Sequence, residues 1–306
     1  MMQLEEKIKE IIYEVLSERA SFGYAGNGDE FYTREEDVRS IFDRLGRELN
    51  GKIVYCPCDN PSESQIYKVL KEKFNDFGLR GIYATWMGKK ACYYDGQQEH
   101  VTPIESGRFQ DNGKYFNMCD VVVTNPPFAS GQPTQMLQMI MKRGKEYILI
   151  APKALTQNQD VFNHVRSGNM YALDYNIDKY NRPDGTIGKA PTAVYTSYRG
   201  ERPMFKTGVK YNPNNYRKFD DYDAIDCGTN YNMIPDDYYG NIAVSSNGGG
   251  FLQKFNPDQF EIVDKLVRPK MDGVPKKRMI IRRKQLQESI YSIALNEIMT
   301  EIKNGN

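Results

Sequence analysis

The stretch CDVVVTNPPFASGQPTQ, residues 119–135, decides how this chain is expected to fold. Three consecutive valines lead directly into Asn125, Pro126, Pro127 and Phe128. Because proline has no backbone N–H, the two prolines would interrupt a ladder of hydrogen bonds and must lie just beyond the end of a strand. We therefore predict a buried strand that ends in a stiff turn, which holds the side chains on either side of the prolines in fixed positions.

Short apolar runs alternate with helical patterns on both sides of this strand. The runs predict strands at 52–58, 79–87, 119–125, 146–153 and 191–198, and the helical patterns lie at 34–49, 62–78 and 134–144. This alternation is typical of an α/β fold with a parallel sheet that carries helices on both faces. In such sheets ligands bind beyond the carboxyl ends of the strands, where CDNPSES (58–64) and TNPPF (124–128) both lie.

The remaining segments have a different character. Residues 88–117 are polar and rich in turn residues, and residues 201–250 are rich in Asn, Asp, Gly, Pro and Tyr. The latter composition predicts loop-rich structure with short strands. Apolar residues at helical spacing predict an amphipathic helix at 3–19 and a closing helix at 284–302.

The composition excludes several classes of protein. No apolar run approaches the ~18 residues of a membrane-spanning helix, and the N-terminus lacks the basic start and apolar run of a secretory signal. Five cysteines without a C-x-x-C pair, and only two histidines, predict neither a disulfide framework nor a metal site. We therefore expect a cytoplasmic protein without a bound metal or a membrane contact.

The net charge is only +1, but the basic residues are unevenly distributed. The segment KKRMIIRRK holds six basic residues and no acidic one: Lys276, Lys277, Arg278, Arg282, Arg283 and Lys284. One interpretation is the solvated start of a helix. The other is a stripe that contacts DNA phosphates, because binding a polyanion requires clustered cations rather than a high total charge.

Asn-Pro-Pro-Phe after an apolar strand resembles the catalytic motif of amino methyltransferases that use S-adenosylmethionine. An exocyclic amine conjugated to a heteroaromatic ring is a poor nucleophile, because its lone pair is delocalised into the ring. The resemblance implies that the Asn125 side-chain oxygen and the Pro126 carbonyl accept the two amine hydrogens. It also implies that Pro127 stiffens the turn and that Phe128 stacks on the base.

Several segments together resemble the EcoRI-type adenine-specific DNA methyltransferases over roughly residues 25–265. They are EFYTREEDV (30–38), VYCPCDNPSES (54–64), VVVTNPPF (121–128), RPDGTIGK (182–189), IPDDYYGNIAV (234–244) and FLQKFNPDQFEIV (251–263). The resemblance implies a Rossmann-like class I methyltransferase fold and methyl transfer to N6 of a flipped adenine in double-stranded DNA. It further implies a cofactor-binding and catalytic domain at 1–200 and a target-recognition region at 201–306.

The resemblance also implies which residues bind S-adenosylmethionine. They are Phe31, Tyr32 and Thr33 of a Phe-x-Thr element, Cys56, Pro57, Asp59, Ser62 and Glu63 around the first loop, Thr85 and Trp86 after the second strand, and Phe109. The usual Gly-rich loop is replaced by CDNPSES, which contains no glycine, so we expect side chains such as Asp59 to contact the cofactor. The second strand lacks the usual acidic residue, and Thr85 or Trp86 would take its place.

Two alternatives remain open. The same motif serves methyltransferases that act on RNA adenine or on protein glutamine, and a DNA-binding relative without catalysis would share most of these features. We expect the chain to be a prokaryotic or phage-encoded monomer that modifies and protects DNA. A companion restriction endonuclease would act on the same site without forming a stable complex with it.

Overall fold

The computed structural model describes residues 31–128, 131–182, 184–219, 222–246, 250–267 and 277–285. The helix predicted at 3–19 lies outside these residues, as does the predicted closing helix beyond Gln285. The described chain divides into two compact units that meet in sequence at Gly200 and Glu201.

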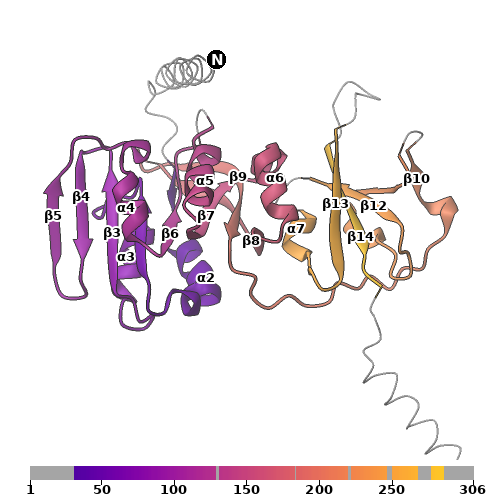
Figure 1. Ribbon diagram of the computed structural model, residues 1–306, viewed down its shortest axis with the longest axis horizontal. Coiled ribbons are helices and arrows are strands. Elements are labelled where there is room, and N and C mark those ends of the chain that lie inside the picture. The colour runs from indigo at the N-terminus through magenta and orange to yellow at the C-terminus, as the bar shows by residue number, and fades with distance from the viewer. Residues whose placement is uncertain are drawn as a thin grey trace, which may run out of the picture. The chain divides into compact units, whose positions relative to one another are not determined.

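The first unit is built on a nine-stranded sheet with the strand order β1-β8-β9-β7-β6-β2-β3-β4-β5 (Figure 1). The strands are β1 Tyr32–Thr33, β2 Ile53–Pro57, β3 Gly81–Trp86, β4 Lys90–Tyr94, β5 Glu99–Pro103, β6 Val121–Thr124, β7 Glu146–Pro152, β8 Tyr171–Asn181 and β9 Ile187–Thr196. The central strands β3, β2, β6 and β7 run parallel. Strand β9 is antiparallel to both of its neighbours, so β8 runs in the direction of β7.

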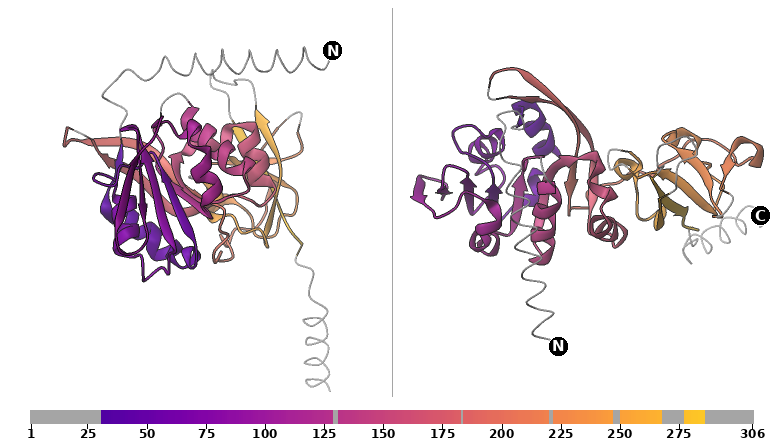
Figure 2. Two further views of the ribbon diagram at one scale, coloured as in Figure 1. Left: turned by 60° about the vertical axis from the view of Figure 1, so that its left-hand side comes forward. Right: turned by 90° about the horizontal axis from the view of Figure 1, so that it is seen from above.

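Helices cover both faces of this sheet (Figure 2). They are α2 Glu35–Leu45, α3 Gln65–Glu72, α4 Gly113–Met118, α5 Gln132–Lys142 and α6 Gln159–Arg166. The chain crosses from β2 through α3 to β3 on one side, and from β6 through α5 to β7 on the other. Because parallel crossovers are right-handed, α3 and α5 lie on opposite faces. The class I methyltransferase fold implied by the sequence is confirmed.

The core explains why the apolar runs form the central strands. Alternate residues of these strands face the helices on the α2 and α3 side, and the aliphatic ones are at most 2% exposed. They include Val54, Val121, Val123, Ile148 and Ile150. Residues of a strand alternate between the two faces, so a strand covered on both sides must be apolar throughout.

The polar segment 88–117 contains more regular structure than its composition predicted. It forms the hairpin of β4 and β5, the 3-10 helix Phe109–Asp111 and α4. All five residues of β5 are exposed, so this strand at the edge of the sheet has no apolar pattern. Strand β8 and helix α6 were likewise not predicted, and α3 ends at Glu72 rather than near Gly78.

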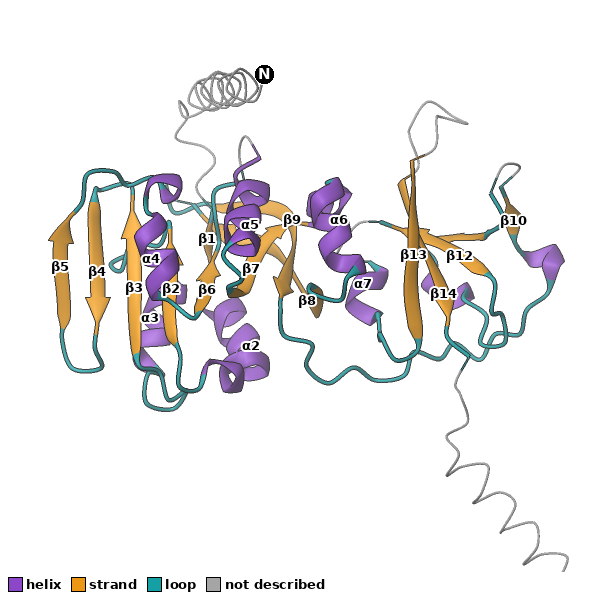
Figure 3. Cartoon of the chain, viewed as in Figure 1, coloured by secondary structure: helices purple, strands orange, loops and turns teal. Residues whose placement is uncertain are grey.

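The second unit is a five-stranded sheet with the order β10-β11-β12-β14-β13 (Figure 3). Its elements are β10 Arg217–Lys218, β11 Ile225–Gly228, β12 Asn241–Ser245, α7 Phe251–Lys254, β13 Phe260–Val267 and β14 Lys277–Arg283. Phe205, Phe251 and Phe260 pack edge-on or tilted against each other. The short strands β10, β11 and β12 are joined by long loops, as predicted for residues 201–250. In neither unit is a described helix long and apolar enough to cross a membrane.

Candidate active site

The carboxyl ends of β2 and β6 lie side by side. The two strands pair in parallel, with Val54 opposite Val121. The strand order reverses here, because the connection from β2 leads to one side and the connection from β6 to the other. Open α/β sheets bind ligands at such a point. The loop 58–64 and the turn 125–128, both identified from the sequence, therefore meet at one edge of the sheet.

The loop after β2 begins with an unusual backbone conformation. Cys58 has a φ of 69°, in the left-handed region that glycine normally occupies. Asn60 Oδ1 accepts hydrogen bonds from the backbone N–H and the hydroxyl of Ser62, and Ser64 caps the N-terminus of α3. The loop is thus held by its own side chains, and Cys58 makes the turn without glycine.

Asp59 connects this loop to β6. Its side chain is 6% exposed; Oδ1 accepts from Ser64 Oγ at 2.6 Å, and Oδ2 lies 3.0 Å from Thr124 Oγ1. The Thr124 hydroxyl also lies within hydrogen-bond distance of the Pro57 carbonyl. A hydroxyl has one hydrogen, so when Thr124 donates to Pro57, only a protonated Asp59 completes the second contact.

Burial agrees with this geometry, because it raises the pKa of Asp59 to about 7, while the hydrogen bonds from Ser64 and Thr124 lower it in part. Both carboxyl oxygens therefore face protein hydroxyls. The direct cofactor contact predicted for Asp59 has no support in this arrangement, and the side chain joins two strand ends instead.

Asn125 has one end of its amide satisfied and the other buried without a partner. Its Nδ2 donates to the Phe31 carbonyl at 2.6 Å. Within the described residues four buried side-chain polar atoms have no hydrogen-bond partner, and Asn125 Oδ1 and Thr33 Oγ1 are two of them. Such an atom costs about 1–3 kcal/mol and is rare in folded proteins. Two of them in residues singled out from the sequence indicate a place prepared for a ligand.

An aromatic cluster lies next to Asn125. The rings of Phe31 and Phe128 are stacked with centroids 5.5 Å apart, and Tyr180 meets both of them edge-on. Tyr180 belongs to β8, which pairs with β1 through Thr33. The predicted Phe-x-Thr element and the Pro-Pro turn are thus brought together from positions far apart in the chain.

Two of the other predicted cofactor residues, Tyr32 and Glu63, link β1 to the loop after β2. The Tyr32 hydroxyl donates to Glu63 Oε2 at 3.1 Å. In contrast, the side chains of Cys56, Thr85 and Phe109 are at most 2% exposed and belong to the core. The Thr85 hydroxyl is hydrogen-bonded to Tyr55 OH at 2.7 Å.

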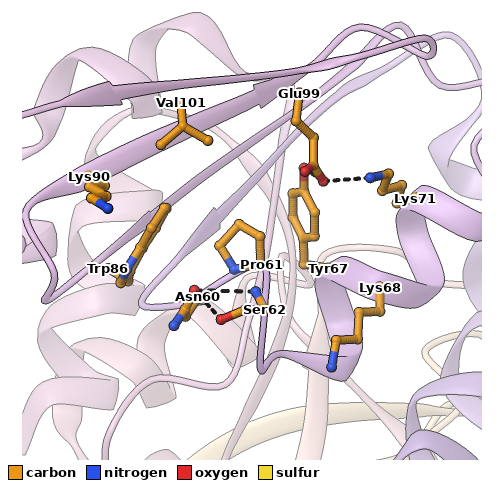
Figure 4. Close-up of a pocket in the computed structure, with 10 residues that line it drawn as sticks. All are labelled: Asn60, Pro61, Ser62, Tyr67, Lys68, Lys71, Trp86, Lys90, Glu99 and Val101. Carbon is orange, nitrogen blue, oxygen red and sulfur yellow. Dashed lines mark hydrogen bonds and ion pairs between the residues drawn. The ribbon is translucent and has the colours of Figure 1, made fainter.

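Ser62 and Trp86 line a pocket of about 540 Å³ on the α3 side of the sheet (Figure 4). Helix α3 contributes Tyr67, Lys68 and Lys71 to its wall, and β4 contributes Lys90. Thr85 does not line this pocket, because neighbouring residues of a strand point to opposite faces. Thr85 and Trp86, the two residues predicted to replace the missing acidic residue of the second strand, therefore lie on different sides of β3.

The basic segment of the second unit is a strand, so its interpretation as the start of a helix is wrong. Residues 277–283 form β14 between β12 and β13 and pair with both. A strand directs successive side chains to opposite faces, so the basic residues do not form one stripe. Lys276 lies outside the described residues, and Lys284 follows the strand and is exposed.

The arginines of β14 are engaged within the second unit. Arg278 pairs with Asp226 at 2.8 Å, and the two side chains are 13% and 12% exposed. Arg282 contacts Glu261 and Asn241. Arg283 is buried, donates to the Pro235 carbonyl at 3.0 Å and lies over the Phe260 ring. These contacts stabilise the sheet, and the predicted phosphate contacts stay a prediction.

Known proteins resemble this chain over most of its length. The sequence profile of the family described as "Adenine-specific methyltransferase EcoRI" matches residues 25–112 and 192–301. The chain is 26% identical to Type II methyltransferase M.EcoRI of Escherichia coli over an alignment of 318 positions, which covers 85% of this chain and 94% of that protein. It is also 26% identical to Type II methyltransferase M.MpnI of Mycoplasma pneumoniae, with 79% of this chain and 83% of that protein covered.

A third relative is Type II methyltransferase M.MgeORF184P of Mycoplasma genitalium, 23% identical over 79% of this chain and 84% of that protein. The profile match covers more than half of the chain and includes both the loop after β2 and most of the second unit. The chain therefore belongs to the EcoRI family of adenine-specific methyltransferases.

Proposed function

We propose that this protein is a site-specific DNA methyltransferase that transfers a methyl group to N6 of adenine in double-stranded DNA, for modification and protection of that DNA. The proposal rests on the hydrogen bonding of the Asn125 side-chain amide. Its nitrogen is held by Phe31, and its buried oxygen has no partner within the described residues. That oxygen is the acceptor that an exocyclic amine requires, and Phe128 lies three residues further on.

The residues around the strand ends fit S-adenosylmethionine, which supplies the electrophilic methyl group. The buried Thr33 hydroxyl has no partner in the described chain and is suited to hold a polar end of the cofactor. The predicted contacts with exposed or half-exposed side chains are Phe31, Tyr32, Ser62, Glu63 and Trp86. Asp59 holds the loop in place from behind through Ser64 and Thr124.

The turn promotes methyl transfer by accepting hydrogen bonds from the target amine. Asn125 Oδ1 and the Pro126 carbonyl each accept a hydrogen bond from one of the two amine hydrogens, so the nitrogen becomes pyramidal and its lone pair becomes available. As the bond between nitrogen and the methyl carbon forms, the bond between that carbon and the donor sulfur breaks, and positive charge grows on the nitrogen. Fixed acceptor dipoles stabilise that charge without reorganising, and the charge is lost when one amine hydrogen leaves as a proton to solvent. Because N6 lies inside the duplex, the adenine has to be flipped out of the stack, and Phe128 offers it a ring to stack on.

Transfer of a labelled methyl group from S-adenosylmethionine tests the proposal. Duplex DNA, RNA and total protein are offered separately to the purified protein, and the label in DNA is then located by digestion to nucleosides. We expect N6-methyladenine in DNA, within one sequence context. Label only in RNA or in protein glutamine would establish the alternative substrates, and binding to DNA without any transfer would establish an inactive relative. A monomeric state and a companion endonuclease stay predictions.

A further inference from the structure

Phe31 contacts both halves of the catalytic turn. Its backbone carbonyl accepts the hydrogen bond from Asn125 Nδ2 at 2.6 Å. Its ring is stacked on Phe128, with centroids 5.5 Å apart and 25° between the planes. The residue lies 94 positions before Asn125, so the fold has to build both contacts. One residue thus reaches the group assigned to the chemistry and the group assigned to stacking.

The ring of Phe31 packs against the hairpin of β8 and β9. Tyr180 meets it edge-on at 5.5 Å, and the Arg182 guanidinium lies over it at 5.5 Å. Gly188 makes room for it, because a Cβ at that position would lie 2.5 Å from Phe31 Cε1. Gly188 is not among the described glycines with positive φ. The Phe31 ring and the Arg182 side chain that lies over it, and not the backbone conformation, therefore require glycine there.

The carbonyl of Phe31 determines which end of the Asn125 amide remains available. A carbonyl can only accept a hydrogen bond, so the amide nitrogen must face it and Oδ1 must face away. The carbonyl is itself held in place, because β1 begins at the next residue and pairs with β8. Without this contact the amide could rotate by half a turn and present donors to the target amine.

We propose that Phe31 is a positioning residue for methyl transfer, which acts through Asn125 and Phe128. Its carbonyl orients the amide, and its ring supports one face of Phe128 and leaves the other face to the flipped base. This inference rests on the proposed function, and it differs from the cofactor contact that the family resemblance implied for Phe31. The glycine at 188 is part of the same arrangement.

The role of the ring is tested with Phe31→Leu and Gly188→Ala, which both keep the Phe31 carbonyl. Fluorescence of 2-aminopurine at the target position of a duplex, chosen from the mapped site, reports base flipping. We expect both variants to lower this signal and to raise KM for the duplex about threefold to tenfold, the effect of one aromatic pair. We expect kcat to change less and binding of S-adenosylmethionine to stay the same. Phe31→Tyr keeps a ring, so its 2-aminopurine signal and its KM for the duplex should be closer to wild type than those of Phe31→Leu.

Gly46→Ala is the matched control for Gly188→Ala. A Cβ at Gly46 would lie 2.5 Å from Cε1 of Phe77, and Phe77 packs on Phe42 of α2 rather than on the catalytic turn. Gly46→Ala should lower the melting temperature and leave KM and the 2-aminopurine signal unchanged. An equal loss of signal in both glycine variants would mean a general packing effect and would overturn the proposal.

If Gly188→Ala does not fold, the result for Phe31→Leu alone tests whether the Phe31 ring positions Phe128. Weaker binding of S-adenosylmethionine with an unchanged 2-aminopurine signal would make Phe31 a cofactor residue, contrary to the proposal. A reduced signal with normal cofactor binding supports it.

The role of the carbonyl is tested with the pH profile of Asn125→Asp. An ionised carboxylate would place an acceptor against the Phe31 carbonyl, whereas a protonated carboxyl donates to it and still accepts with its other oxygen. We therefore expect the rate of this variant, relative to wild type, to fall as the pH rises through the pKa of the introduced carboxyl. A rate ratio that does not change with pH would overturn the role of the carbonyl.

Failure of the proposed function gives a different result from failure of this inference. If the wild-type protein transfers no methyl group to duplex DNA, the proposed function is wrong, and the positioning role is lost with it. If the wild type is active and Phe31→Leu matches it in KM, kcat and 2-aminopurine signal, only the positioning role is wrong.

Discussion

Asp59 Oδ2 and Thr124 Oγ1 lie 3.0 Å apart and join the loop after β2 to the residue that precedes Asn125. Both side chains are buried. The contact ties the segment proposed to bind the cofactor to the segment proposed to bind the base. A change at Asp59 is therefore expected to affect the stability of the strand ends first.

Replacing Asp59 with asparagine should change how stability depends on pH. The folded-state pKa of Asp59 is raised to about 7, above its unfolded value of about 3.9. Between these values the folded state keeps a proton that the unfolded state has lost, so this carboxyl makes stability fall as pH rises through that window. Asparagine does not ionise, and the decline between about pH 4 and about pH 7 should be smaller in Asp59→Asn by on the order of 2–4 kcal/mol.

The comparison is made by denaturant unfolding of both proteins across that pH range. Thr124→Ser serves as the control, because it keeps the hydroxyl that faces Asp59 and should keep the wild-type dependence. The same pH dependence in Asp59→Asn and wild type would mean that Asp59 titrates normally in the folded protein.

Replacing Arg278 with glutamine should lower stability without changing how DNA binding depends on salt. The change leaves the largely buried Asp226 without its cation, at a cost of about 1–3 kcal/mol. Lys284→Gln is the matched change at an exposed cation and should leave stability within about 0.5 kcal/mol. Unfolding midpoints and the slope of log affinity against log salt are measured for both. A flatter slope in Arg278→Gln would assign a phosphate contact to Arg278.

Removing the Phe128 ring should weaken binding of the flipped base. Stacking on an aromatic side chain contributes about 1–3 kcal/mol per base, so Phe128→Ala should lower the apparent affinity for duplex DNA by about fivefold to a hundredfold. Phe128→Tyr keeps the stacking face and should stay near the wild-type affinity. Titration of a duplex with 2-aminopurine at the target position measures both, and equal affinities for Phe128→Ala and wild type would exclude stacking on this ring.

The sequence predicts the centre of the first unit well because burial leaves a signal there. Strands that are covered on both faces must be apolar, and a pair of prolines after such a run marks the end of the strand. These two facts place Asn125 and the loop 58–64 at one edge of the sheet. The exposed strand β5 has no such signal, since it pairs with β4 at the edge of the sheet and none of its five residues is buried.

Other features of the site depend on partners that are distant in the chain. Asp59 is polar in sequence and was expected to face a ligand, but Ser64 and Thr124 enclose it. The cations of 277–283 suggest an exposed surface until β12 and β13 are seen on both sides of them. The contact of Phe31 with Asn125 likewise joins positions that only the folded sheet brings together. No local pattern encodes these contacts.

Single-turnover methylation of duplex DNA by Asn125→Ala tests whether Asn125 is the acceptor for the target amine. The variant loses the acceptor for the target amine, at the point where positive charge grows on the nitrogen, and the loss in rate should be about a hundredfold or more. Cofactor binding should stay close to wild type. Stability should fall only by the loss of the hydrogen bond from Nδ2 to the Phe31 carbonyl, about 0.5–1.5 kcal/mol, because Oδ1 has no partner to lose within the described residues. A methylation rate equal to that of the wild type would mean that Asn125 does not take part in catalysis and that the turn is purely structural.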